Sequence, residues 1–153
     1  FSVGGHPAFK LPMTTDTAYH DYFLKFDQEE TAGRWPISPD GLIEQEPLPL
    51  LDRNNLLPVT KELFAKDALV LKHLQSNRVT LASNKTNKAI TFCFPGFDYL
   101  GLWAAKGADF FCIEPWCGIA DSVQASQQLT DKEGIQSLAP QAVFERTWSV
   151  ALQ

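Results

Sequence analysis

Two residues far apart in the sequence have the types and surroundings that acid–base chemistry needs. Glu114 is a lone carboxylate at the end of an apolar, strand-like stretch within Phe110–Ser122. A charge in such a setting is costly unless it has a partner or a task. The N-terminal run Ser2–Phe9 supplies an imidazole, that of His6. A carboxylate and an imidazole can act as general base and general acid near neutral pH, so we interpret this pair as candidate catalytic residues.

Each of the two also has an ordinary structural interpretation. A histidine on a strand can be a core residue bonded to a backbone carbonyl, and this alternative stays open for His6. Glu114 precedes the turn Pro115–Gly118, so it can equally be a surface carboxylate at a strand end.

The neighbours of His6 favour a site above the sheet. If residues 2–9 form a strand, side chains alternate between its two faces. His6 then shares its face with small residues only, which are Ser2, Gly4 and Ala8. That face has room for something other than protein.

The hydrophobic pattern of the chain mostly has a period of two, which is typical of half-buried strands. Four segments show it, and they are residues 20–27, 78–83, 89–94 and 144–152. The polar stretch Asn84–Lys88 separates the second from the third, so this pair is predicted to form a hairpin. Many strands and little helix indicate an all-β sandwich or barrel.

Only two short segments are predicted to be helical. Residues 60–66 are predicted to give one or two turns with Thr60 as N-cap, and residues 131–135 one turn weakened by Gly134. Residues 28–59 and 123–141 are rich in turn-forming residues and indicate loops or irregular edge strands.

The composition indicates one globular domain or a large part of one. The chain has 153 residues, 44% hydrophobic, with a net charge of −5 and a pI near 5.1. Without a run rich in lysine or arginine, nucleic acid and anionic membranes are poor partners. No apolar stretch reaches the roughly 20 residues that a membrane-spanning helix needs. The three cysteines form no C-x-x-C pair, so we expect reduced thiols in a cytoplasmic protein.

Three further residues are candidates for substrate binding. Asp67 opens the run Ala68–Leu71 after the short helical segment; it is either a turn residue that caps backbone N–H groups or a ligand for substrate. Trp103 is either a core residue or a carbohydrate-binding one, because the apolar face of a pyranose packs on an indole. Trp116, beside Glu114, is predicted to line the same pocket.

The chain lacks the sequence motifs of several enzyme classes. The chain has no HExxH, GxSxG, Walker or GxGxxG motif, and His20 and His73 have no metal-ligand spacing. We therefore predict no metal and no cofactor.

Three stretches resemble the aldose 1-epimerase (galactose mutarotase-like) family, most closely its bacterial branch. They are residues 1–9, 99–103 and 112–122, which include the family's Gly-Gly-His-Pro-Ala-Phe and Ile-Glu-Pro-Trp-x-Gly-Ile-Ala-Asp motifs. The resemblance covers essentially the whole chain but only the C-terminal half of a family member. It implies a large antiparallel β-sandwich with a shallow sugar-binding cleft on one sheet. Residues 1–153 would be the C-terminal part of this single domain, with the N-terminal half absent.

The resemblance also implies roles for individual residues. His6 falls on the family's general acid, Glu114 on its general base and Asp67 on the aspartate that holds sugar hydroxyls. The family's binding arginine and second histidine lie upstream and have no counterpart here. Because opposite charges stabilise each other, we expect the pairing with His6 to lower the pKa of Glu114.

These implications define two competing functions. The first is an isomerase that interconverts the anomers of a monosaccharide by acid–base ring opening, with the N-terminal half of the same protein as partner. The second is a non-catalytic carbohydrate-binding β-sandwich; a structural domain without ligand is a third possibility. A spacing of His6 and Glu114 that admits one sugar ring favours the enzyme. A wide separation, or pairing of Glu114 with Arg146, favours the others.

Overall fold

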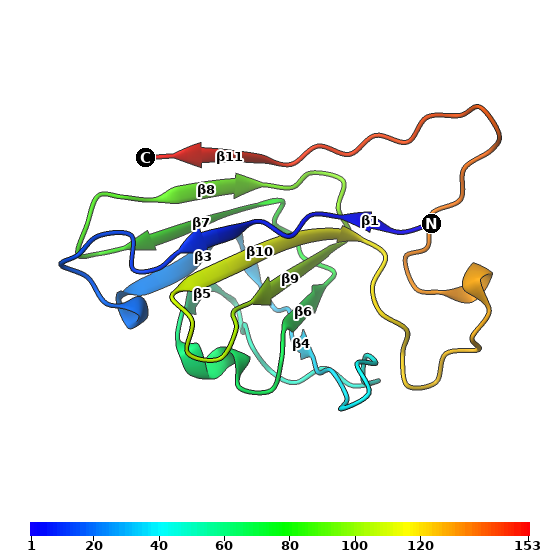
Figure 1. Ribbon diagram of the computed structural model, residues 1–153, viewed down its shortest axis with the longest axis horizontal. Coiled ribbons are helices and arrows are strands. Elements are labelled where there is room, and N and C mark those ends of the chain that lie inside the picture. The colour runs from blue at the N-terminus through cyan, green and yellow to red at the C-terminus, as the bar shows by residue number, and fades with distance from the viewer.

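The computed structural model describes all residues 1–153 and consists of two antiparallel sheets packed face to face (Figure 1). The first, the site sheet, has the order β1-β10-β9-β6-β4, with β2 also paired to β10. The second, the back sheet, has the order β11-β8-β7-β3-β5. The structure thus confirms the sandwich and not the barrel.

The strands are short, and the longest are β10 in the site sheet and β3 in the back sheet. The site sheet contains β1 (Val3–Gly4), β2 (Ala8–Lys10), β4 (Arg34–Trp35), β6 (Leu69–Lys72), β9 (Tyr99–Trp103) and β10 (Phe110–Cys117). The back sheet contains β3 (Tyr22–Glu30), β5 (Asn54–Pro58), β7 (Arg78–Ser83), β8 (Ile90–Cys93) and β11 (Ser149–Leu152).

Three of the four predicted strands form, although the first begins only at Tyr22 because residues 20 and 21 belong to a 3₁₀ turn. The predicted hairpin is the pair β7–β8. The fourth is shorter than its pattern, because only Ser149–Leu152 pairs, with β8. Before it, the Arg146 side chain donates from Nε to the carbonyl of Gly96 at 2.6 Å, and Trp148 stacks on Phe92 with ring centroids 5.4 Å apart. These side-chain contacts fix the segment without a backbone ladder.

The helical segments are 3₁₀ turns. They are η1 (Tyr19–Asp21), η2 (Lys61–Phe64) and η3 (Leu129–Asp131). Thr60 does precede η2, but its side chain makes no capping hydrogen bond, and η3 begins before the predicted turn. None of the three is long or apolar enough to cross a membrane. Within residues 28–59, β4 and β5 are edge strands.

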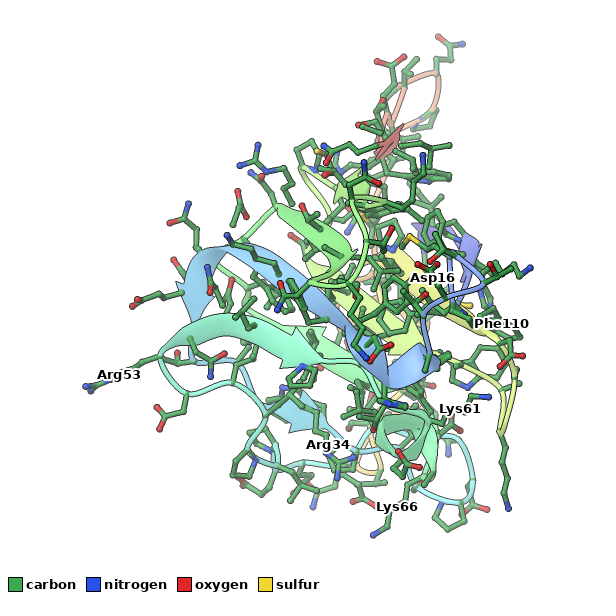
Figure 2. The ribbon with its side chains drawn as sticks, turned by 90° about the vertical axis from the view of Figure 1, so that its left-hand side faces the viewer. Asp16, Arg34, Arg53, Lys61, Lys66 and Phe110 are labelled. Carbon is green, nitrogen blue, oxygen red and sulfur yellow. The ribbon has the colours of Figure 1, made fainter.

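The main core lies between the two sheets, where the side chains in Figure 2 are crowded. Alternate residues of β10, including Phe111 and Ile113, point into this core. Lys61 ties η2 to the loop before β10 by donating to Asp109 at 2.8 Å (Figure 2). A second, smaller apolar cluster covers part of the outer face of the site sheet and includes Val70, Tyr99 and Trp116. This cluster does not include Glu114, so the outer face of β10 around that residue is available for a site.

One side of the sandwich is left open. The terminal strands β1 and β11 run along this side of the two sheets (Figure 1). Exposed apolar side chains gather there: Phe1, Val3, Trp148, Val150 and Leu152. Unpaired strand edges with apolar side chains favour association with further strands.

We expect the 153-residue chain, expressed alone, to self-associate through this open side. Leu152→Lys should reduce that association, since it places a charge at the strand edge and costs little because Leu152 is 77% exposed. Sedimentation and dye binding to apolar surface would measure it. Val143→Lys is the matched control, because Val143 is 79% exposed but lies outside any strand. A monomer that melts cooperatively at high concentration would contradict the expectation.

Candidate active site

The register of three strands brings His6 opposite Glu114. On one side of His6, Val3 pairs with Cys117 and Gly4 with Trp116. On the other side, Ala8 pairs with Cys112. The register is the same in both ladders, so no residue is inserted between them and position 6 faces position 114.

The interruption between β1 and β2 has a simple cause. Pro7 and Pro115 have no N–H group, so neither can donate to the ladder. The connection persists through their carbonyls: Gly5 N–H donates to Pro115 at 3.0 Å and Ile113 N–H donates to Pro7 at 3.3 Å. His6 and Glu114 lie between these two bonds, where antiparallel side chains approach each other closely.

The two side chains meet on the outer face of the site sheet. His6 Nδ1 lies 3.3 Å from Glu114 Oε1. The His6 side chain is 61% exposed and the Glu114 side chain only 8%. The carboxylate thus forms the floor of the site and the imidazole its exposed rim.

Two indoles flank this pair. Glu114 faces Gly101 of β9, and a Cβ atom at Gly101 would collide with the Trp116 ring. The indole therefore lies over Gly101, immediately beside the carboxylate. Trp103 approaches from the other side, with its ring edge-to-face to His6 at 5.8 Å between centroids. Both tryptophans are half-buried, so both present surface at the site.

The pKa of Glu114 is raised, contrary to our expectation. Burial is the largest cause, and it outweighs the lowering by the His6 charge and by the approach of the Trp116 indole N–H. The expectation was wrong because the sequence shows the partner but not the depth of burial. A higher pKa brings the carboxyl group closer to neutral pH, which suits a general base.

Sequence reasoning did not assign a role to Cys112, which lies beside the pair. It alternates with Glu114 along β10 and is buried. Burial, with a smaller effect of the Glu114 charge, raises its thiol pKa to about 11. The alternation along the strand was the signal that could have identified this neighbour.

Asp67 lies apart from the pair. It is exposed, precedes β6 with φ of 103°, and its carboxylate accepts the N–H of Ala68 at 2.7 Å. Aspartate tolerates such a left-handed backbone better than most residues. This geometry agrees with the turn interpretation. The structure gives Asp67 no hydrogen bond or ion pair to His6 or Glu114.

The spacing within the pair differs from the expected one. At 3.3 Å the two groups touch, so no sugar ring fits between them. Arg146 is not the partner of Glu114, because it donates to the carbonyls of Gly96 and Glu145. A ligand would instead lie over both groups, on the outer face of the site sheet.

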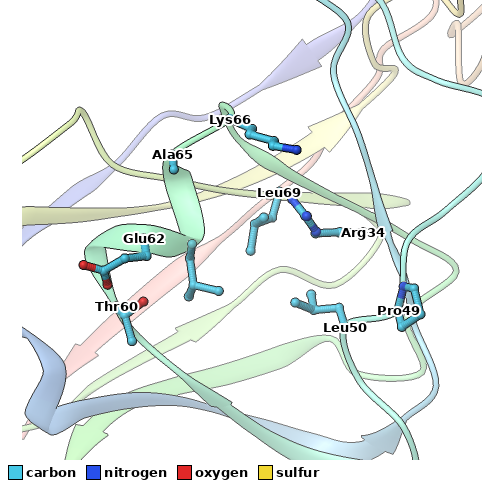
Figure 3. A pocket seen from close by; sticks show the side chains of 9 residues that line it. Arg34, Pro49, Leu50, Thr60, Glu62, Ala65, Lys66 and Leu69 are labelled. Atoms are coloured by element: carbon cyan, nitrogen blue, oxygen red, sulfur yellow. The ribbon is translucent and has the colours of Figure 1, made fainter.

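Two hollows of the chain do not include the pair. A groove of about 410 Å³ continues beyond Trp116 on the same face and is lined by apolar residues such as Val70 and Ile119. The other, of about 420 Å³, lies beside η2 and is lined by residues that include Arg34 and Lys66 (Figure 3). Neither is lined by His6 or Glu114, so within this chain the pair lies on an open face.

Fold and site together define an antiparallel β-sandwich protein that carries an imidazole–carboxylate pair between two indoles. No protein-family profile matches the sequence. The chain is 30% identical over 155 residues to protein LacX of Lactococcus lactis, covering 99% of this chain and 52% of that protein. It thus spans about half the length of the curated relatives it matches.

Comparison with solved structures identifies the fold of this chain. A galactose mutarotase related enzyme from Lactobacillus acidophilus superposes with a TM-score of 0.88 at 29% identity, over 100% of this chain and 52% of that one. A galactose mutarotase-like protein from Lactobacillus casei gives 0.86 at 26%, over 100% and 53%. The chain has the galactose mutarotase-like fold and corresponds to about half of such a protein.

The raised pKa of Glu114 predicts how stability depends on pH. A carboxyl group with a higher pKa in the folded chain than in the unfolded chain holds its proton more firmly when folded. Its contribution favours folding at acidic pH and is lost as the pH rises through the folded-state pKa. Glu114→Gln stays neutral, so we expect it to gain stability over wild type as the pH rises from the ordinary value of 4.5 towards neutrality.

Melting temperatures of both proteins between about pH 4 and about pH 8 would measure this difference. Glu29→Gln, an exposed carboxylate on the back sheet, is the matched control and should show no such trend. If the stability difference between Glu114→Gln and wild type does not change with pH, the pKa of Glu114 is not raised in the folded chain.

Proposed function

We propose that this chain supplies the acid and the base of an aldose 1-epimerase, or mutarotase, which interconverts the anomers of a monosaccharide. The observation that carries the proposal is the cross-strand pairing of His6 with Glu114, 3.3 Å apart on an open face between two indoles. The similarity to a galactose mutarotase related enzyme supports the same reaction class.

The contact between acid and base suits the substrate. The anomeric hydroxyl and the ring oxygen are bonded to the same carbon, so both reacting atoms lie side by side. A base and an acid that are themselves neighbours can reach both from one face of the sugar. Groups placed in this way typically accelerate proton transfer by about 10²–10⁴-fold each.

In the proposed reaction Glu114 removes the proton of the C1 hydroxyl while His6 protonates the ring oxygen. The bond between C1 and the ring oxygen breaks, and C1 becomes an aldehyde. Rotation about C1–C2 and the reverse transfers then close the ring on either face. His6 Nδ1 faces the carboxylate, so Nε2 is the nitrogen that delivers the proton. The steps balance without oxidation or reduction.

The surrounding residues have supporting roles in this proposal. Trp103 and Trp116 offer flat apolar surface to the ring C–H groups, and Asp67, just before β6, would bind sugar hydroxyls. All three cysteines are free thiols, which agrees with the cytoplasmic location that we propose.

We further propose that residues 1–153 are the C-terminal half of a single domain. The chain spans about half the length of its relatives, and its open side at β1 and β11 carries exposed apolar residues. An N-terminal half packed at this side would cover the exposed apolar residues and enclose the outer face of the sheet above His6.

A non-catalytic carbohydrate-binding module is the second candidate. The observation in its favour is that neither of the two hollows described above includes the pair, while the two indoles remain available for stacking on a sugar. Binding without exchange of anomers would distinguish it from the enzyme.

The enzyme proposal predicts the effect of removing each proton-transfer group. In the complete gene product, Glu114→Gln and His6→Asn should each lower kcat by about 10²-fold or more with a smaller effect on KM, since the lost interaction belongs to the transition state. NMR of anomer exchange would measure both constants. Glu29→Gln and His20→Asn, both at exposed positions, are matched controls. Exchange near the wild-type rate in Glu114→Gln would leave the binding module as the better function.

The same experiment has a pH signature. Activity requires an ionised Glu114 and a protonated His6, so the profile should be bell-shaped. Since burial raises the pKa of Glu114, the acidic limb should lie above the range of an ordinary glutamate. The two groups interact, so each limb reports the pair and not one residue.

Sugar binding should be visible in the tryptophan fluorescence. Titration with the aldose that is exchanged should change the emission, and Trp103→Ala or Trp116→Ala should weaken binding because ring stacking is lost. Trp35→Ala is the control, since Trp35 lies over Lys72 further across the sheet. If neither of the first two variants alters the affinity, both are packing residues only.

A further inference from the structure

Three different metal-binding atoms converge at the acid–base pair. A ring nitrogen of His6, the sulfur of Cys112 and a carboxylate oxygen of Glu114 all lie within 4.8 Å of one another. Cys112 and Glu114 alternate on β10 and so point to the same outer face, where His6 faces them from the neighbouring strand. Histidine nitrogen, cysteine sulfur and carboxylate oxygen are each ligands that zinc takes in proteins.

We propose that His6, Cys112 and Glu114 bind one borderline or soft divalent cation, such as Zn²⁺ or Cd²⁺, and that its binding blocks the acid–base pair. Metal binding itself depends only on the three ligands. The blocking effect rests on the proposed function.

The distances suit tetrahedral coordination. Zinc bonds to nitrogen and oxygen of about 2.0–2.1 Å place two such ligands about 3.3–3.4 Å apart at neighbouring corners of a tetrahedron. His6 Nδ1 and Glu114 Oε1 are already 3.3 Å apart. The sulfur of Cys112 lies within 4.8 Å of a ring nitrogen of His6 and of a carboxylate oxygen of Glu114, so it would have to move closer to take the third corner.

Charge and ligand type select the cation. The thiol loses its proton on coordination, and a thiolate with a carboxylate neutralises a divalent ion, which suits a half-buried position. Mg²⁺ and Ca²⁺ require several oxygen ligands, but this site has one carboxylate and a sulfur. Sulfur and imidazole ligands favour zinc-like metals instead.

The fourth corner faces outward. Glu114 and Cys112 are buried, whereas the His6 side chain is 61% exposed, so the open position lies on the side where we expect the sugar. A cation held here engages the nitrogen and the oxygen that proton transfer needs. Neither Glu114 nor His6 could then exchange protons with a substrate.

The test uses the metal-free complete gene product titrated with Cd²⁺, whose bond to a thiolate has its own ultraviolet absorption, followed by competition with Zn²⁺. We expect one thiolate-bound cation in the wild type and in the controls Cys93→Ser and His20→Asn. Cys112→Ser should lose the thiolate absorption and bind Zn²⁺ at least about 10-fold more weakly. His6→Asn, at an exposed position, should keep the absorption but also bind at least about 10-fold more weakly.

Several results would overturn the proposed metal site. They are a wild type without thiolate absorption, an absorption lost in Cys93→Ser and kept in Cys112→Ser, or wild-type affinity in His6→Asn. Blocking is measured separately, as anomer exchange with and without Zn²⁺ relative to the metal-free rate of each variant. Metal binding with undiminished exchange would overturn the blocking effect alone. A metal-free wild type without any exchange would overturn both the blocking effect and the proposed function, while the metal-binding result would still stand.

Discussion

The common register of β1 and β2 on β10 is the constraint on which the site depends. It holds Gly4 opposite Trp116 and Ala8 opposite Cys112, and it therefore fixes His6 opposite Glu114. A shift by one residue would turn the imidazole to the other face of the sheet. Two prolines interrupt the ladder at this point, and their carbonyls alone keep it continuous. The positions of these two side chains thus depend on backbone pairing, and no contact of their own is needed to align them.

Burial and pairing act on Glu114 in opposite directions, and burial is the stronger. The carboxylate is enclosed from below by the sheet and from the side by Trp116. A site of this kind holds a charge that the fold does not favour, which is typical of groups that are kept for chemistry. His6 compensates only in part, because it is largely exposed to water. The exposed imidazole and the buried carboxylate therefore differ in their access to water, a difference that the residue types alone did not show.

The sequence predicted features that depend on local pattern and failed where distant residues decide. The alternation along residues 110–117 placed Glu114 and Trp116 on one face, and the hairpin β7–β8 followed from a polar turn. The direction of the Glu114 pKa shift could not be predicted, because the sequence shows the partner His6 but not the depth at which the folded chain buries the carboxylate. The alternating pattern of residues 144–148 predicted a strand, but side-chain contacts of Arg146 and Trp148 replace the ladder there. For Asp67 the sequence left a turn role and a ligand role open, and the geometry of the folded chain agrees with the turn role.

Gly101 has a consequence beyond packing. Any side chain at this position would collide with the Trp116 ring, so the indole lies against the sheet only because position 101 has no side chain. The same indole brings its N–H towards Glu114, which lowers the pKa of the carboxyl group against the larger effect of burial. A substitution at this one glycine on the neighbouring strand would therefore alter the electrostatic surroundings of Glu114 without any change in a charged or polar residue.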